Sequence, residues 1–243
     1  MTLLPKNKQP GSINDEKPGG NPLFPVFLKL NELHTVLIGA GNIGLEKLTA
    51  VLQNSPDATV TVIALAFLPE VHLLAARHKG VTILQKAFSD NDLDEADLVV
   101  AATNNSELNR FIRQAAHDRK LLINVADRPE LCDFYLSSIV KKGDLKIAIS
   151  TNGKSPTIAK RLKEVLNESL PDELDTTLQQ MNQLRTTLSG DFAGKVKTLN
   201  ELTSVLIDRK PDINKSNYGS GSWDRYTHQY KKYFSFFTAL FIK

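Results

Sequence analysis

A glycine fingerprint between a β-type run and a helical run constrains the fold of this 243-residue chain more than any other feature. The hexapeptide Gly39–Gly44 reads G-A-G-N-I-G and follows the β-rich run LHTVLI at 33–38. Apolar residues then recur at helical spacing, and a second β-type run, ATVTVIA, covers 58–64. These three parts form a βαβ unit of about thirty residues. The unit predicts a Rossmann-type domain that binds a dinucleotide.

Each glycine of the fingerprint has a separate expected task. Gly39 allows the tight turn out of the strand, Gly41 lets the backbone approach a pyrophosphate, and Gly44 lets the helix pack close to the sheet. The phosphates would sit at the N-terminus of the helix, where unpaired N–H groups and the helix dipole favour negative charge. The alternative is a glycine-rich turn that binds no ligand.

Strand and helix patterns alternate as far as Ala126, which predicts a parallel, doubly wound α/β sheet. Alternating apolar residues at 24–30 also predict a short strand ahead of the fingerprint. The expected helices cover 70–79 and 106–119, and the remaining expected strands cover 81–84, 97–103 and 121–126.

The pattern changes after Asp127. The segment 134–151 predicts two short strands around a Lys-Lys-Gly-Asp turn, and therefore a hairpin rather than a crossover. Ser155 and Pro156 supply an N-cap and a first-turn proline for a helix at 157–170. Two further helices are expected at 173–188 and 194–207. The expected organisation is a flexible arm at 1–20, a dinucleotide-binding domain at 21–133, a hairpin region at 134–168, a helical domain at 169–207, and a linker with an aromatic tail at 208–243.

The end of the second strand indicates which dinucleotide binds. An acidic residue usually holds the adenosine ribose of NAD at this place, but the sequence reads IALAF at 63–67. No arginine stands there to hold the 2′-phosphate of NADP. We therefore expect NAD, with Leu65 and Ala66 touching the nucleoside through backbone and apolar contacts.

Asp127 is the candidate acid/base residue. It lies at the carboxyl end of a predicted parallel strand, the edge at which doubly wound sheets bind their ligands. A carboxylate there can exchange a proton with a substrate held over the nicotinamide. The alternative is a residue that begins a turn before Arg128 and Pro129.

A basic cluster surrounds the glycine turn at 150–156, and its candidate ligand-binding residues are Lys154, Ser155 and Arg161. Cations beside a helix N-terminus suit a polycarboxylate ligand. The alternative is a capped helix with a solvated basic face. Sequence alone leaves these alternatives open.

Composition argues against several other classes. A net charge of +3 without a run of five basic residues is not that of a nucleic-acid-binding protein. The only cysteine, Cys132, allows no disulfide framework and no thiolate metal cage, and no histidines share the helical spacing of a metal site. We expect no transmembrane segment, since the aromatic stretch at 233–242 is too short to cross a bilayer. Without a signal peptide, a reducing cytoplasm is expected.

The chain resembles the precorrin-2 dehydrogenase and sirohydrochlorin ferrochelatase family, the N-terminal half of bacterial sirohaem synthase. The resemblance extends in order from Asn21 to Leu206. The segments that carry it are FPVFLKL, VLIGAGNIGLEK, VAATNN, INVADRPELCDFYLSSIV and IAISTNGKSP.

The resemblance implies NAD-dependent oxidation of precorrin-2 to sirohydrochlorin, with Fe²⁺ insertion as a further activity that only some members have. It implies a homodimer built through the hairpin region, and a helical part beside the substrate. Asp127 matches the family's catalytic aspartate, which is implicated as a general acid/base and in chelation. The positions that fall in the family's NAD site are Asn42, Ile43, Leu65 and Ala66. Thr103 is a further candidate cofactor-binding residue. The competing hypothesis is a non-catalytic NAD-sensing module that binds a protein partner.

Overall fold

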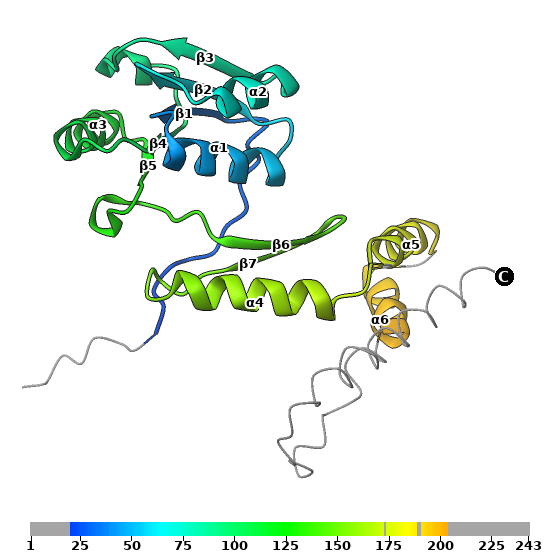
Figure 1. The fold of residues 1–243 in the computed structure, drawn as a ribbon. Helices are drawn as coiled ribbons and strands as arrows, with labels where there is room; N and C mark the ends of the chain where they lie inside the picture. Colours follow the sequence, from blue (N-terminus) through cyan, green and yellow to red (C-terminus); the bar gives the residue numbers. More distant parts are fainter. Residues whose placement is uncertain (1–19, 173, 189–190, 204–243) are drawn as a thin grey trace, which may run out of the picture.

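The computed structural model describes residues 20–172, 174–188 and 191–203 (Figure 1). The predicted linker and aromatic tail at 208–243 lie outside the described residues, as do the first nineteen residues of the predicted arm.

The N-terminal half is one parallel sheet with the strand order β3-β2-β1-β4-β5. The chain runs outward from β1 through β2 to β3, then crosses back to place β4 on the other side of β1. The carboxyl ends of β1 and β4 therefore form the switch point at which such sheets bind ligands. The strands are β1 (His34–Ile38), β2 (Thr59–Ala64), β3 (Val81–Gln85), β4 (Leu98–Ala101) and β5 (Leu122–Val125).

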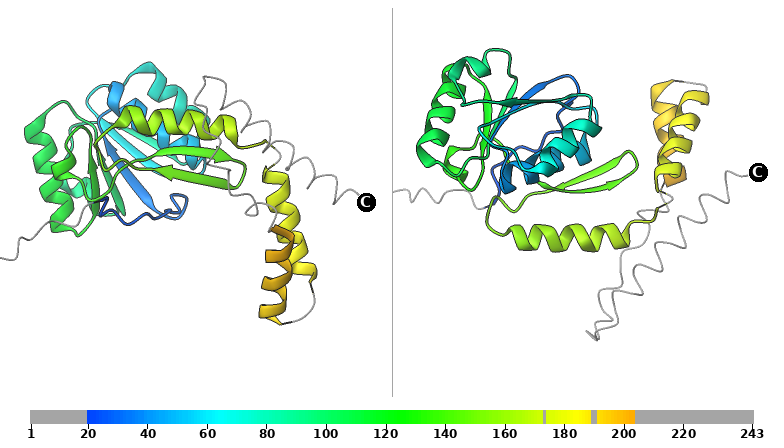
Figure 2. Two further views of the ribbon diagram at one scale, coloured as in Figure 1. Left: turned by 90° about the horizontal axis from the view of Figure 1, so that it is seen from below. Right: turned by 45° about the horizontal axis from the view of Figure 1, so that its top comes forward.

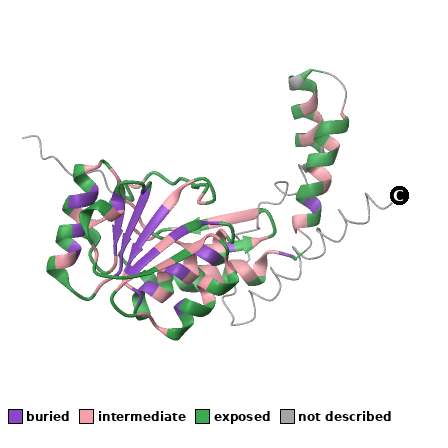
Figure 3. Ribbon diagram, turned by 90° about the horizontal axis from the view of Figure 1, so that it is seen from above, coloured by how far each residue is buried: buried purple, intermediate pink, exposed green. Residues whose placement is uncertain are grey.

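Helices cover both faces of this sheet, as the alternating pattern predicts. Helices α1 (Asn42–Asn54) and α2 (Pro69–Arg77) pack on the face that carries Leu37 and Val100. Helix α3 (Ser106–Asp118) packs on the opposite face with the short 3-10 helix η1 (Asp90–Leu93). Strands β1, β2, β4 and β5 are the most deeply buried part of the described chain, whereas the edge strand β3 has no buried residue (Figure 3). Such a core holds the strand ends, and the loops that follow them, in fixed positions.

The second half begins with the expected hairpin, formed by β6 (Ser138–Lys142) and β7 (Leu145–Ile149). Helix α4 (Pro156–Ser169) follows and lies along the hairpin (Figure 2). The predicted cap is confirmed, because the Ser155 hydroxyl accepts a hydrogen bond from the Ile158 N–H at 3.2 Å. Helices α5 (Leu174–Thr187) and α6 (Phe192–Thr203) lie beyond the end of α4, away from the sheet.

The strand predicted at 24–30 is wrong. This segment is neither helix nor strand and pairs with no strand of the described chain. Its alternation does not separate a buried face from a solvated one, since Phe24, Val26 and Phe27 are all more than half exposed. A strand needs a neighbouring ladder as well as an apolar pattern, and the pattern alone does not supply the neighbour.

No helix among the described residues is long and apolar enough to cross a membrane.

Candidate functional site

Two of the three fingerprint glycines are required by close packing within the chain. Gly39 has a φ of +108°, and a Cβ at this position would lie 2.4 Å from the carbonyl oxygen of Ala102 at the end of β4. A Cβ on Gly44 would lie 2.0 Å from the carbonyl oxygen of Gly39. The turn between β1 and α1 can therefore form only if both side chains are absent.

Gly41 is different, because a Cβ there would meet no atom within 4 Å. Gly41 is the N-cap of α1, where no side chain caps the helix and the first turn carries no acidic residue. The first N–H groups of α1, at Asn42 and Ile43, are thus at an exposed helix N-terminus. The residues present fit the phosphates of a dinucleotide, and no contact inside the chain explains the glycine.

The other candidate cofactor residues lie at the same edge of the sheet. Leu65 and Ala66 follow β2 and are exposed. Thr103 follows β4, and its hydroxyl donates a hydrogen bond to Asn109 Oδ1 at 2.7 Å. The Asn109 amide in turn donates to the carbonyl oxygen of Thr103 at 3.0 Å, which fixes the loop after β4 on the first turns of α3.

Asp127 lies in a cleft of about 400 Å³ formed by the end of β5, the hairpin and the start of α4. Thr151, Gly153 and Pro156, from the segment IAISTNGKSP, line the same cleft. The structure thus brings together Asp127 and the segment IAISTNGKSP, although more than twenty residues lie between Asp127 and Thr151.

The backbone of Asp127 is in the left-handed region, with a φ of +58°. A non-glycine residue adopts this conformation at a cost, and Asp is among those that tolerate it best. No hydrogen bond or ion pair to its carboxylate is found among the described residues. The backbone of the turn therefore determines where this carboxylate lies.

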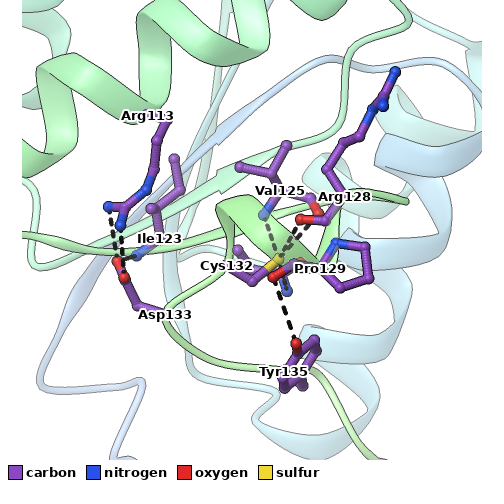
Figure 4. A network of polar contacts seen from close by, with 9 residues as sticks. Arg113, Ile123, Val125, Arg128, Pro129, Cys132, Asp133 and Tyr135 are labelled. Atoms are coloured by element: carbon purple, nitrogen blue, oxygen red, sulfur yellow. Dashed lines mark hydrogen bonds and ion pairs between the residues drawn. The ribbon is translucent and has the colours of Figure 1, made fainter. Parts of the chain in front are cut away.

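The loop that carries Asp127 is tied to β5 by side chains (Figure 4). The thiol of Cys132 contacts the backbone of Val125 and Arg128, and burial raises its pKa above the ordinary value. Asp133 accepts two hydrogen bonds from the guanidinium of Arg113 on α3, at 3.1 and 2.9 Å. The 3-10 helix η2 (Pro129–Leu131) lies between these anchors and Asp127.

The predicted polycarboxylate-binding residues do not line the cleft themselves. Lys154 and Ser155 lie between Gly153 and Pro156, which do line it. Arg161 is exposed on α4, and its guanidinium pairs with Glu164 at 2.8 Å.

Two cations that sequence reasoning did not assign are in the lining of the cleft. Lys47 reaches it from α1, with only 22% of its side chain exposed and its ammonium 3.0 Å from Glu46. Arg128 reaches it from the Asp127 loop. Lys47 follows Gly44 by three residues and therefore lies on the same face of α1. This spacing could have predicted from the sequence that Lys47 lies near the site.

Among the described residues, no group of three or more His, Cys, Asp or Glu side chains is placed to hold a metal ion.

Comparison with known families divides the chain at the hairpin. Residues 26–138 match the family described as putative NAD(P)-binding, and residues 142–169 match the sirohaem biosynthesis protein central family. Among solved structures, the chain is similar to SirC, described as a precorrin-2 dehydrogenase, with a TM-score of 0.62 and 23% identity. That similarity covers 87% of this chain and 100% of the other, and it confirms the fold.

Curated relatives of the chain include sirohaem synthases. The enzyme of Psychromonas ingrahamii is 39% identical over 151 residues, which are 62% of this chain and 31% of the relative. That of Citrobacter koseri is 33% identical over 171 residues, 70% of this chain and 36% of the relative. The chain therefore spans about a third of the length of the curated relatives it matches. The chain thus matches an NAD(P)-binding family over 26–138 and the sirohaem biosynthesis protein central family over 142–169, and it is similar to about a third of the length of these sirohaem synthases.

Proposed function

We propose that the chain oxidises precorrin-2 to sirohydrochlorin with NAD as the hydride acceptor. The observation that carries the proposal is the position of Asp127 in a cleft at the carboxyl edge of the sheet. The turn Gly39–Gly44 between β1 and α1, here called the dinucleotide cradle, lies at the same edge. The name of the similar solved structure, SirC precorrin-2 dehydrogenase, supports the same reaction. NAD is preferred to NADP because no cation follows β2 at 63–67 to hold a 2′-phosphate.

The reaction removes two hydrogens from the tetrapyrrole, one as a hydride and one as a proton. NAD⁺, which the turn Gly39–Gly44 would hold, would supply the acceptor for the hydride and its two electrons. Asp127 accepts the proton from the substrate carbon framework and releases it to water, so charge and electrons balance. An acid/base group for this purpose must lie within hydrogen-bonding reach of the substrate, and a carboxylate that is free of partners in the cleft meets that need.

The cleft has cations for a substrate with several carboxylates. Lys47 and Arg128 line it, and we assign them to the substrate carboxylates nearest Asp127. Lys154, Ser155 and Arg161 extend this surface along the start of α4 and are proposed to bind carboxylates farther out. Cations on two sides of one cleft favour a polyanion over a neutral substrate.

A homodimer through the region 134–168 is part of the proposal. Helix α4 exposes Ile158, Leu162 and Val165, which recur at helical spacing and form one apolar stripe. A second copy of the chain would cover this stripe. Sedimentation of Leu162→Lys should show monomers where the wild type shows dimers, and a monomeric wild type would contradict the proposal.

The direct test is anaerobic incubation of the purified protein with enzymatically generated precorrin-2 and NAD. NADH and the sirohydrochlorin absorption bands should appear together. Asp127→Ala should abolish turnover while NAD still binds, and unchanged turnover would remove Asp127 from the reaction. If NAD binds but the wild type oxidises nothing, a non-catalytic NAD-sensing module becomes the better interpretation.

Insertion of Fe²⁺ into sirohydrochlorin stays a prediction of the family resemblance. Adding Fe²⁺ after oxidation is complete tests it, because sirohaem must form faster than in a control without protein. The cytoplasm likewise stays the predicted compartment.

A further inference from the structure

The exposed edge of β5 is completed by side chains instead of by another strand. In the described sheet β5 pairs with β4 only, so the N–H groups of Ile123 and Val125 on its other edge need partners. Asp133 Oδ2 accepts from the Ile123 N–H at 3.1 Å, and Cys132 Sγ accepts from the Val125 N–H at 3.2 Å. The Asp133 N–H also donates to the Ile123 carbonyl oxygen at 2.8 Å.

The sulfur of Cys132 contacts the chain on both sides of Asp127. Its S–H is within reach of two acceptors, the carbonyl oxygens of Val125 at 3.1 Å and Arg128 at 3.3 Å. The Asn124 amide approaches the same sulfur at 3.6 Å. The sulfur thus contacts both Val125 at the end of β5 and Arg128 after Asp127 (Figure 4). These contacts add to the backbone hydrogen bond from the Arg128 N–H to the Val125 carbonyl oxygen at 3.3 Å, which closes the turn that contains the left-handed Asp127.

We propose that Cys132 is a positioning residue that holds the Asp127 turn in its left-handed conformation and so aims the carboxylate into the cleft. The proposal rests on the proposed function only for its kinetic readout. Its structural content, a thiol that fixes the Asp127 turn, rests on the contacts of residues 124–133.

The position of the sulfur is itself fixed from two directions. Asp133, the next residue, is held by the bidentate Arg113 pair and by β5. The Asn124 amide donates to the Phe134 carbonyl oxygen at 2.9 Å and holds the chain just beyond. Because its neighbours are anchored, loss of the thiol should release the turn and leave the rest of the loop in place.

Substitution of Cys132 by alanine or by serine separates the loss of all hydrogen bonding by the thiol from the loss of its size alone. Alanine leaves the Val125 N–H without its acceptor, and of the contacts between Val125 and Arg128 it leaves only the backbone hydrogen bond from the Arg128 N–H to the Val125 carbonyl oxygen at 3.3 Å. Serine keeps a donor and an acceptor, although its shorter C–O bond weakens the longer contacts. The order wild type, serine, alanine is therefore the expected order of turn rigidity.

The kinetic experiment is a double-mutant cycle in the full chain with precorrin-2 and NAD. Cys132→Ala should lower kcat roughly 10- to 100-fold, because a misplacement of about 1 Å can cost that much. The Kd for NAD should not change, and Cys132→Ser should recover much of kcat. In the Asp127→Asn background, Cys132→Ala should lower kcat no further. Thr35→Val is the matched control, because Thr35 is buried near the N-terminal end of β1, at the edge of the sheet opposite Asp127.

The same factor lost in both backgrounds would overturn the proposal, and so would an unchanged kcat. A second measurement does not depend on activity. In a crystal structure of Cys132→Ala, Asp127 should leave the left-handed region, and an unchanged φ near +58° would overturn the proposal. If wild-type protein oxidises no precorrin-2, the proposed function fails, and this structure still decides the role of Cys132.

Discussion

Two turns at the carboxyl edge of the same sheet each contain a left-handed residue, but different forces hold them. Gly39 follows β1 with a φ of +108°, and Asp127 follows β5 with a φ of +58°. The first turn is fixed by excluded volume, because backbone atoms of Ala102 and of Gly39 fill the space where side chains at Gly39 and Gly44 would stand. The second is closed by one backbone hydrogen bond, from the Arg128 N–H to the Val125 carbonyl oxygen, and is held on β5 by the side chains of Cys132 and Asp133.

This difference decides how each turn tolerates change. A turn set by excluded volume has one solution, since any Cβ collides with backbone atoms that cannot move away. A turn set by side-chain contacts can lose them one at a time and relax in steps. The dinucleotide cradle must let the backbone approach a pyrophosphate closely. An acid/base residue must instead place its carboxylate within hydrogen-bonding reach of one substrate atom.

The largest expected effect on stability comes from a substitution in the first turn. Gly39→Ala should lower the free energy of unfolding by about 3 kcal/mol, because strain at positive φ and overpacking each contribute about 1–3 kcal/mol. Gly41→Ala is the matched control, since its Cβ meets nothing within 4 Å. It should leave the unfolding midpoint unchanged and weaken NAD binding. Urea unfolding and NAD titration measure both variants.

Equal destabilisation by the two substitutions would contradict the steric account of the cradle. Unchanged NAD affinity in Gly41→Ala would contradict the assignment of the open space beside Gly41 to the dinucleotide.

The next largest effect on stability is expected from a substitution in the loop that holds the second turn. Asp133→Ala removes the partner of Arg113 and the acceptor of the Ile123 N–H, which should cost about 2 kcal/mol in free energy of unfolding. Asp133→Asn keeps the acceptor for Ile123 and weakens only the ion pair, so its cost should be about half as large. Amide hydrogen exchange should show the loss confined to β5 and its loop, and a loss spread over the whole sheet would argue against a local anchor.

The two turns also differ in how far they could be predicted from the sequence. The turn between β1 and α1 can be predicted from the sequence, because strand, glycines and helix are contiguous and Gly39 and Gly44 have local steric reasons. The position of Asp127 at a strand end was predicted as well, from the β-type run before it. Its cleft was not, because the cleft depends on how the hairpin and α4 pack against β5. The same limit applies to the strand predicted at 24–30, whose apolar pattern has no neighbouring strand.

Lys47 links the two turns, because it belongs to α1 in sequence and to the Asp127 cleft in space. Lys47→Met keeps most of the apolar stem and removes the charge. It should raise KM for precorrin-2 about tenfold, the equivalent of roughly 1.4 kcal/mol, and leave NAD affinity unchanged. Lys163→Met, on α4 outside the cleft lining, is the control. An equal change in both variants would show a general charge effect instead of a site.

The smallest expected effect is the pH dependence of stability that Cys132 introduces. Burial raises the pKa of this thiol above its ordinary value of 9.0, so the folded chain holds the proton more tightly than the unfolded chain. Between the two pKa values the unfolded state has lost the proton while the folded state keeps it. The free energy of unfolding therefore falls as the pH rises through this window, and the contribution is fully present below it.

Urea unfolding of wild type and Cys132→Ser from about pH 7 to about pH 10 isolates this contribution, because the chain has no other cysteine. The difference in stability between the two should be constant at neutral pH and should shift against the wild type only above the ordinary thiol pKa. Parallel curves over the whole range would mean that the thiol is no more buried in the folded chain than in the unfolded one. A turn held by its sulfur should therefore weaken in alkali, where the cradle, built without a titrating group, should not.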